Sequence, residues 1–234
     1  MLFKFLIITI VTIILITLLD ISSTNKITQQ NIEFIKDIYD RSTEHYKKKI
    51  QQLIDWHIAY HHPFIVERSY KIHTPTRKIN DSRFAIFIDL DAFLTKDKYI
   101  DEKKWLEFSK IIDIPLEIEQ KCIDSMIKGE EQVDFIWGLD PLEEKEKIYL
   151  EYPSKGLIES YIVQDGEVTD KYEYIKRKTD SSRFKFMYTR TSSDGLKDSF
   201  HYVLSEPLIK DNKTIYVVSY SPFSETQTYY YRFQ

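Results

Sequence analysis

The sequence predicts an α+β protein in which two or three helices pack on one large antiparallel, tyrosine-rich β-sheet, behind an N-terminal transmembrane helix. Three observations predict this fold. An apolar run opens the chain, amphipathic helical patterns follow near residues 28–60 and 101–128, and short segments separated by turn residues fill residues 133–234. Consecutive strands with short connections pair antiparallel. A half-barrel or a barrel is the alternative arrangement of the same strands.

The apolar run covers residues 2–19, and Lys4 is its only charged residue. At about 1.5 Å per residue, a helix of this length approaches the hydrocarbon thickness of a bilayer. We interpret it as a membrane anchor, with a cleaved signal peptide and a buried core helix as alternatives. Because Lys4 precedes the run and Asp20 follows it, the N-terminus should be cytosolic and the remaining chain lumenal or extracellular. Cleavage would instead make the protein secreted.

Three regions follow from these patterns. Residues 1–20 form the anchor, residues 21–60 a stalk-like amphipathic helix, and residues 61–234 a single α+β domain whose sheet lies mainly in residues 133–234. In the second region, apolar residues recur at helical spacing from Ile32 to Leu53, and Pro63 ends the pattern.

The third region begins with two predicted strands, at residues 63–72 and 83–94. Two helices follow at residues 101–112 and 116–128, and Gly129 is a typical residue after a helix end. The remaining predicted strands lie near residues 133–139, 145–152, 157–164, 168–176, 183–191, 199–209, 214–221 and 226–233. Asp165-Gly166 is typical of a two-residue hairpin turn.

The composition argues against several classes of protein. A net charge of −4 does not suit a general nucleic-acid binder, so we expect no nucleic-acid partner. Five glycines leave little room for phosphate-binding loops, and the single cysteine, Cys122, excludes a disulfide framework within the chain. The sequence contains no Walker loop, nucleophile elbow or dinucleotide fingerprint.

The clearest local motif is Asp89-Leu90-Asp91, which ends a hydrophobic strand. Both carboxylates would lie on one face of the strand, where they could share a divalent cation. Residues 88–93 resemble the first motif of Y-family DNA polymerases and, more loosely, that of haloacid dehalogenase-like phosphatases. The motif also resembles the D-x-D of metal-dependent glycosyltransferases, which implies a Mg²⁺ or Mn²⁺ site at Asp89 and Asp91. The alternative is a half-exposed strand without a ligand.

Other candidate residues have ordinary structural explanations. His57 and His61 have the i, i+4 spacing of metal ligands on a helix, but no third ligand is evident nearby. Cys122 shares a helical face with Ile118 and Met126, which is typical of a buried apolar residue. We expect no cofactor apart from Mg²⁺ or Mn²⁺ in a transferase. The glycosylation sequons at Asn80 and Asn212 fit a lumenal domain.

Three functions remain open. The leading hypothesis is a membrane-anchored, non-catalytic binding or scaffolding protein, in contact with the membrane through residues 2–19 and with a protein partner through its tyrosine-rich sheet. The alternative is a type II membrane transferase that uses Asp89 and Asp91. The third is a barrel-like domain with a pocket for a small ligand. The sequence identifies no catalytic residue.

Overall fold

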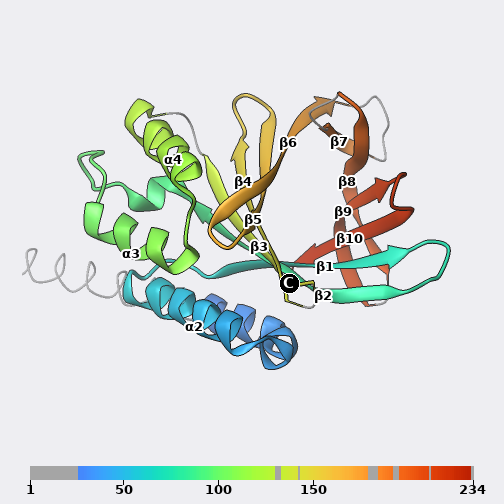
Figure 1. The fold of residues 1–234 in the computed structure, drawn as a ribbon, viewed down its shortest axis with the longest axis horizontal. Helices are drawn as coiled ribbons and strands as arrows, with labels where there is room; N and C mark the ends of the chain where they lie inside the picture. The colour runs from blue at the N-terminus through green and yellow to red at the C-terminus, as the bar shows by residue number, and fades with distance from the viewer. Residues whose placement is uncertain are drawn as a thin grey trace, which may run out of the picture.

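The computed structural model describes residues 26–129, 133–141, 143–178, 184–191, 195–210 and 212–232. Ten antiparallel strands form a closed barrel in this part of the chain (Figure 1). The strands are β1 (Ile65–His73), β2 (Ile79–Asp89), β3 (Asp134–Asp140), β4 (Lys145–Tyr152), β5 (Leu157–Gln164), β6 (Glu167–Lys178), β7 (Phe184–Thr191), β8 (Lys197–Lys210), β9 (Lys213–Ser221) and β10 (Thr226–Arg232).

The barrel closes through the pairing of its first and last strands. Each strand pairs with the next along the chain, and β1 also pairs with β10, so that Glu67 lies opposite Arg232 and His73 opposite Thr226. The prediction of helices on one large open sheet is therefore wrong. The prediction did not foresee how β1 and β2 would pair. Because β1 pairs with β10 and β2 pairs with β3, the sheet formed by β3 to β10 has no free edge.

The turns of the barrel follow from local sequence. Between β5 and β6, Asp165 and Gly166 both adopt positive φ, at 53° and 74°. Two consecutive positive φ angles match the right-handed twist of the two strands, and this conformation favours an Asp-Gly pair. The predicted hairpin turn at Asp165-Gly166 is confirmed.

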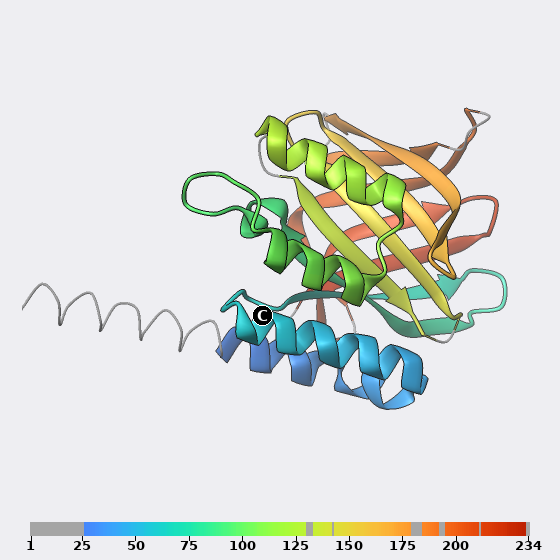
Figure 2. The ribbon, with the colours of Figure 1, turned by 60° about the vertical axis from the view of Figure 1, so that its left-hand side comes forward.

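Helices cover the outer wall of one side of the barrel (Figure 2). A helix over residues 26–41 and α2 (Glu44–Ala59) lie beside β1 and β2, whereas α3 (Glu102–Ile112) and α4 (Leu116–Lys128) connect β2 to β3. Their apolar faces and the outer faces of the strands share one core, which includes Ile38, Leu53, Ile86, Phe108, Phe135 and Leu150. The helices predicted at residues 101–112 and 116–128 are thus present.

The predicted single helix over residues 28–60 is interrupted at Ser42 and Thr43. The Ser42 hydroxyl donates a hydrogen bond of 2.8 Å to the carbonyl of Ile38, and the backbone of Thr43 is extended. A serine that bonds to the backbone offers it an alternative to the helical pattern. Both resulting helices contribute buried residues to the core shared with the barrel, where the sequence suggested a stalk.

The expectation of a single-pass membrane protein needs correction. In the described part of the chain, no helix combines the length and the apolar character needed to cross a membrane. These helices are amphipathic: α2, for example, buries Ile50 and Leu53 and exposes Lys48 and Gln51. The predicted anchor itself, residues 2–19, lies outside the described residues.

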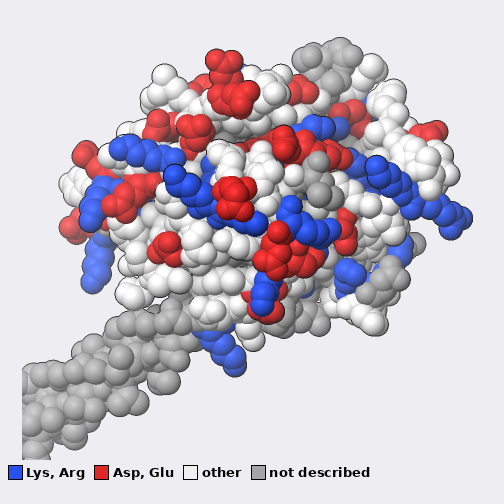
Figure 3. All heavy atoms as spheres, turned by 60° about the horizontal axis from the view of Figure 1, so that its bottom comes forward, with Lys and Arg blue, Asp and Glu red and all other residues white. Residues whose placement is uncertain are grey.

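Charges of both signs are interspersed over the outer surface seen in Figure 3. This mixing accompanies the small net charge of −4. A surface with mixed charges produces no extended field of one sign and so attracts no particular class of charged partner over long range.

Candidate functional site in the barrel interior

The alternation of side chains along the strands places polar groups inside the barrel. In β4, Ile148 and Leu150 point outward and are buried beneath the helices, so that Lys147, Tyr149 and Glu151 point inward. The same alternation holds in β2. In each of these strands the buried apolar face packs against helices. The opposite face, which is polar in β4 and mixed in β2, therefore lines the interior.

These inward side chains enclose a cavity of about 660 Å³. A volume in this range suits a small organic ligand. The lining extends from Lys145, at the barrel end next to the turn after β3, to Arg232 at the opposite end. The cavity is thus a built feature of the whole barrel and not a gap beneath one loop.

Aromatic and imidazole rings line the middle of the cavity. The rings of Tyr174 and His201 meet edge to face with centroids 5.0 Å apart, and the ring of Tyr230 lies 6.2 Å from that of His201. Tyr149 lies 6.5 Å from Tyr174. Burial raises the pKa of Tyr149 to about 12 and raises that of Tyr174 further, so both hydroxyls stay protonated at neutral pH. They are available as hydrogen-bond donors to a ligand.

Basic groups lie among these rings. Arg83 Nε is 3.6 Å from an Asp140 carboxylate oxygen, and Arg190 pairs with Asp198 at 2.6 Å. Lys147 differs, because no described residue forms a hydrogen bond or an ion pair with its Nζ. Burial, together with the smaller effects of the nearby charges of Arg83 and Arg190, lowers the pKa of Lys147 to about 7.

His201 stays neutral at physiological pH. Desolvation lowers its pKa to about 3, and the cations Arg190, Lys147 and Arg83 act in the same direction. Its Nε2 lies 3.1 Å from the Ser199 hydroxyl. A neutral imidazole can donate one hydrogen bond and accept another, so His201 adds a polar contact without adding charge.

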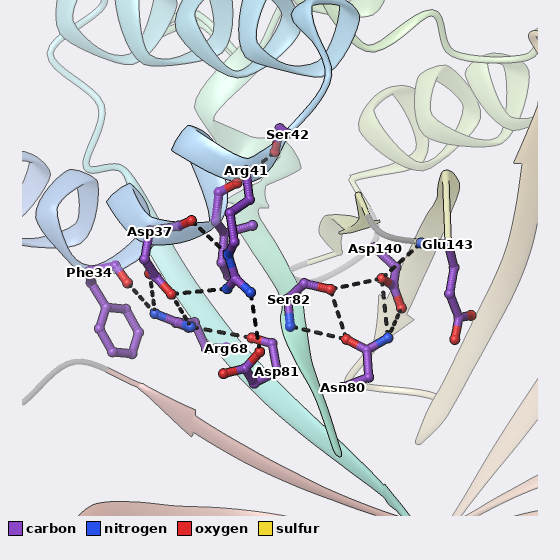
Figure 4. A network of polar contacts seen from close by, with 11 residues as sticks. Phe34, Asp37, Arg41, Ser42, Arg68, Asn80, Asp81, Ser82, Asp140 and Glu143 are labelled. Carbon is purple, nitrogen blue, oxygen red and sulfur yellow. Dashed lines mark hydrogen bonds and ion pairs between the residues drawn. The ribbon is translucent and has the colours of Figure 1, made fainter. Parts of the chain in front are cut away.

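A polar network around Asp140 lies at one end of the barrel (Figure 4). Asp140 is buried and accepts hydrogen bonds from Asn80 Nδ2 at 3.0 Å and from the Ser82 hydroxyl at 3.1 Å. Ser82 also donates to Asn80 Oδ1 at 2.7 Å. Since Asp140 faces Arg83 as well, the network fixes the position of the guanidinium within the cavity.

A second network in Figure 4 joins the helix over residues 26–41 to β1. Arg68 donates to the Phe34 carbonyl at 2.8 Å and to both Asp37 carboxylate oxygens, at 2.7 and 3.1 Å. Burial alone would raise the pKa of Asp37, but the hydrogen bond and the charge of Arg68 outweigh it and hold that pKa below its usual value. This bidentate pair fixes helix to barrel.

Asp89 is the last residue of β2, whereas Asp91 lies in the 3₁₀ turn that follows, so the two carboxylates do not lie on one face of a strand as predicted. Asp89 Oδ1 accepts a hydrogen bond of 2.9 Å from the backbone N–H of Asp91, and thereby caps a 3₁₀ turn over Leu90–Phe93. Asp91 faces Lys98 at 3.7 Å. Among the described residues, no group of three His, Cys, Asp or Glu side chains is arranged to hold a metal ion. The metal site at Asp89 and Asp91 stays a prediction.

The other residues singled out in the sequence lie apart from the cavity. His57 is fully buried, with its Nδ1 3.3 Å from that of His62, and desolvation lowers its pKa to about 3. Cys122 lies on α4 and is buried in the core between the helices and the barrel, and this burial raises the pKa of its thiol. Asn212 lies in the exposed turn between β8 and β9, whereas the amide of Asn80 belongs to the network around Asp140. Glycosylation of either asparagine stays a prediction.

Sequence reasoning missed Arg83, Lys147, Arg190 and His201 as site residues. The signal for Lys147 is present in the sequence, because polar residues alternate with Ile148, Leu150 and Tyr152 over residues 147–152 of β4. Such a pattern is ordinarily assigned to a strand with one face in water. Only closure of the barrel converts that face into the wall of an internal cavity.

Comparison with known proteins adds no family assignment. No model of a known protein family matches the sequence, and neither does any curated protein.

Proposed function

We propose that the protein binds a small organic anion inside its barrel. The observation that carries the proposal is Lys147, a basic group without a partner among the described residues, placed near Arg83 and Arg190 in a tyrosine-lined cavity of about 660 Å³. This proposal develops the third hypothesis drawn from the sequence, a barrel with a pocket for a small ligand.

The energetics of the cavity favour a negative ligand. Three basic side chains close together inside a protein repel one another, and this repulsion is stronger than in water because the local dielectric constant is lower. Asp140 offsets the charge of Arg83, and Asp198 offsets that of Arg190. An anion placed beside Lys147 would offset the third and favour its protonated form.

The rings define the rest of the ligand. Tyr149, Tyr174 and Tyr230 present aromatic faces and hydroxyl groups to the same space. Aromatic side chains suit an apolar or aromatic body, and their hydroxyls can donate to its polar atoms. We therefore expect a carboxylate, sulfonate or phosphate attached to an aromatic or compact apolar group.

A fluorescence titration with a matched pair of dyes tests this proposal. 1-Anilinonaphthalene-8-sulfonate carries a sulfonate, whereas N-phenyl-1-naphthylamine has the same rings without it. We expect the anionic dye to bind more tightly than the neutral one. Lys147→Met should weaken binding of the anionic dye about tenfold, since a hydrogen bond to a charged group contributes about 1.5–3 kcal/mol. Binding of the neutral dye should not change.

Two controls accompany the titration. Lys110→Met removes an exposed lysine of α3 and should affect neither dye. Lys147→Arg keeps a positive charge in the cavity and should retain most of the affinity for the anionic dye. Equal binding of the two dyes, or an anionic dye that binds equally to the Lys147→Met variant, would contradict the proposal.

A further inference from the structure

We propose that Lys147 is a reactive amine that captures a small aldehyde or ketone inside the barrel as a reversible imine. The inference rests on the proposed function in one respect only, the entry of a small organic molecule into the cavity. It does not require that the molecule be an anion. The class of ligand is a carbonyl compound with an aromatic or compact apolar body.

The surroundings of Lys147 leave its amine accessible to a ligand. No described residue forms a hydrogen bond or an ion pair with Nζ, which points into the cavity. In the β-sheet, the neighbour of Lys147 on β3 is Gly138, which has no side chain, and its neighbour on β5 is Ile162, which is apolar. Neither neighbour has a side-chain group that can form a hydrogen bond or an ion pair with the amine.

Gly138 also accommodates the adjacent ring. A Cβ atom at Gly138 would lie 3.3 Å from the Tyr149 ring and 3.8 Å from the Lys147 Cβ. The absence of that Cβ lets the Tyr149 ring lie across β3, beside the stem of Lys147. A substrate carbonyl bound at Nζ would therefore have a phenol in the same part of the cavity.

The charged groups around Lys147 favour its neutral form. The titratable and charged side chains that line the cavity or interact with Lys147 come from all sides of the barrel: Glu67, Arg68 and Lys71 on β1, Arg83 on β2, Asp140 at the end of β3, Glu143 in the turn after it, Lys145, Tyr149 and Glu151 on β4, Tyr174 on β6, Tyr188 and Arg190 on β7, His201 on β8, Tyr216 on β9, and Tyr230 and Arg232 on β10. The nearby acids are paired with other cations: Asp140 lies within ion-pair distance of Arg83, and Glu143 lies within ion-pair distance of Lys71 and Lys145. With its pKa near 7, a large fraction of Lys147 is neutral at physiological pH.

The reaction needs no additional reagent. The lone pair of neutral Nζ attacks the carbonyl carbon, a C–N bond forms, and a proton passes from nitrogen to the carbonyl oxygen to give a carbinolamine. Loss of that hydroxyl with a second proton from nitrogen releases one molecule of water and leaves the C=N bond. Tyr149, whose raised pKa keeps it protonated, can donate to the developing oxygen. Addition of water reverses the sequence.

Reductive trapping with benzaldehyde and cyanoborohydride tests the inference on the full-length protein. Benzaldehyde is uncharged, so its capture does not depend on anion binding. At pH 7.5 we expect a single lysine side chain to carry a benzyl group, located on Lys147 by peptide mass mapping, which also separates it from any label on the α-amino group. An ordinary exposed lysine, with a pKa near 10.4, holds on the order of 10³-fold less neutral amine relative to its charged form. Labelling of Lys147 should therefore reach half its maximal rate near pH 7, and labelling of exposed lysines should keep rising above pH 9.

Two variants separate reactivity from charge and folding. Lys147→Arg keeps the positive charge but removes the nucleophile, so it should lose the adduct while its thermal unfolding and its binding of the anionic dye are retained. Lys110→Arg should keep the adduct. The peptide map of the unmodified protein locates the reactive site without either variant.

The outcomes distinguish the inference from the proposed function. An anionic dye that binds in the cavity, together with benzyl groups spread over exposed lysines, would overturn the inference and leave the proposed function standing. An adduct on Lys147 in a protein that does not prefer the anionic dye would support the inference and overturn anion binding. Failure of both measurements would reject both.

Discussion

Glu67 is a carboxyl group in an environment that disfavours its charge. It lies on the inner face of β1, with its carboxylate 3.4 Å from Arg232 Nε on the paired strand β10. Burial raises the pKa of Glu67 to about 7, and the charge of Arg232 offsets only part of that effect. Near neutral pH the barrel therefore holds a carboxyl group close to its midpoint of ionisation, next to the seam where the first and last strands meet.

This position predicts a pH-dependent stability. Because the folded pKa exceeds the unfolded one, the folded state binds the proton more tightly, and stability falls as the pH rises from about 4.5 through 7. Glu67→Gln should remove that loss and raise the free energy of unfolding at pH 8 by about 1–3 kcal/mol relative to the wild type, with little change at pH 4.5. Urea denaturation at both pH values measures it.

Glu33→Gln, at an exposed position of the helix over residues 26–41, is the matched control and should leave the pH dependence unchanged. Equal effects of Glu67→Gln at pH 4.5 and pH 8 would show that packing, and not ionisation, determines its contribution.

At the scale of elements, local sequence predicts boundaries better than it predicts partners. The ends of α3 and α4 agree with the prediction because Asp101 accepts a hydrogen bond from the Lys104 N–H and Gly129 adopts φ 59°, as such termini require. Most strand boundaries agree within a few residues, since turn residues separate them. The pairing of β1 with β10 has no local signal in the sequence, because it joins residues that are far apart in the chain, such as Glu67 and Arg232.

The turn after β2 supplies a test of the Asp89 and Asp91 motif. Asp89→Ala should lower the free energy of unfolding by about 0.5–1 kcal/mol because it removes the cap on the Asp91 N–H, and Asp89→Asn should retain most of that stability because an amide oxygen can still accept. Thermal unfolding of the three proteins measures it.

The same measurement with added ions addresses the transferase hypothesis. With no third ligand placed beside these carboxylates in the described chain, we expect Mn²⁺ and Mg²⁺ to leave the melting temperature unchanged. A rise in melting temperature that Asp91→Asn abolishes would contradict this expectation and favour the metal-dependent transferase.

At the scale of the whole molecule, the site depends on closure in a way that no single strand shows. Lys147 on β4, Arg190 on β7 and Arg83 on β2 come together only when all the strands surround one space. From the sequence, each of these residues reads as part of a water-exposed strand face. The barrel alternative contained the correct topology, but nothing in the residues themselves distinguished a closed sheet from an open one.

Removal of the last strand should therefore abolish the site and expose the sheet. A chain that ends at residue 221 lacks β10 and leaves β1 and β9 each with an unpaired edge. We expect it to lose the binding of the anionic dye and to self-associate, as measured by fluorescence titration and by size-exclusion chromatography. A monomeric truncated chain with unchanged dye affinity would show that β10 is dispensable.

The pairing of β1 with β10 also constrains the order of events during synthesis. The core between the helices and the outer faces of β1 to β5 uses residues up to Val163, so it can form while the later strands are still inside the ribosome. Glu67 cannot meet Arg232 until β10 has left the exit tunnel. The helical side of the nascent chain can thus fold early, but the cavity exists only after β10 has emerged. Until then the exposed edge of β1 depends on other means to avoid aggregation.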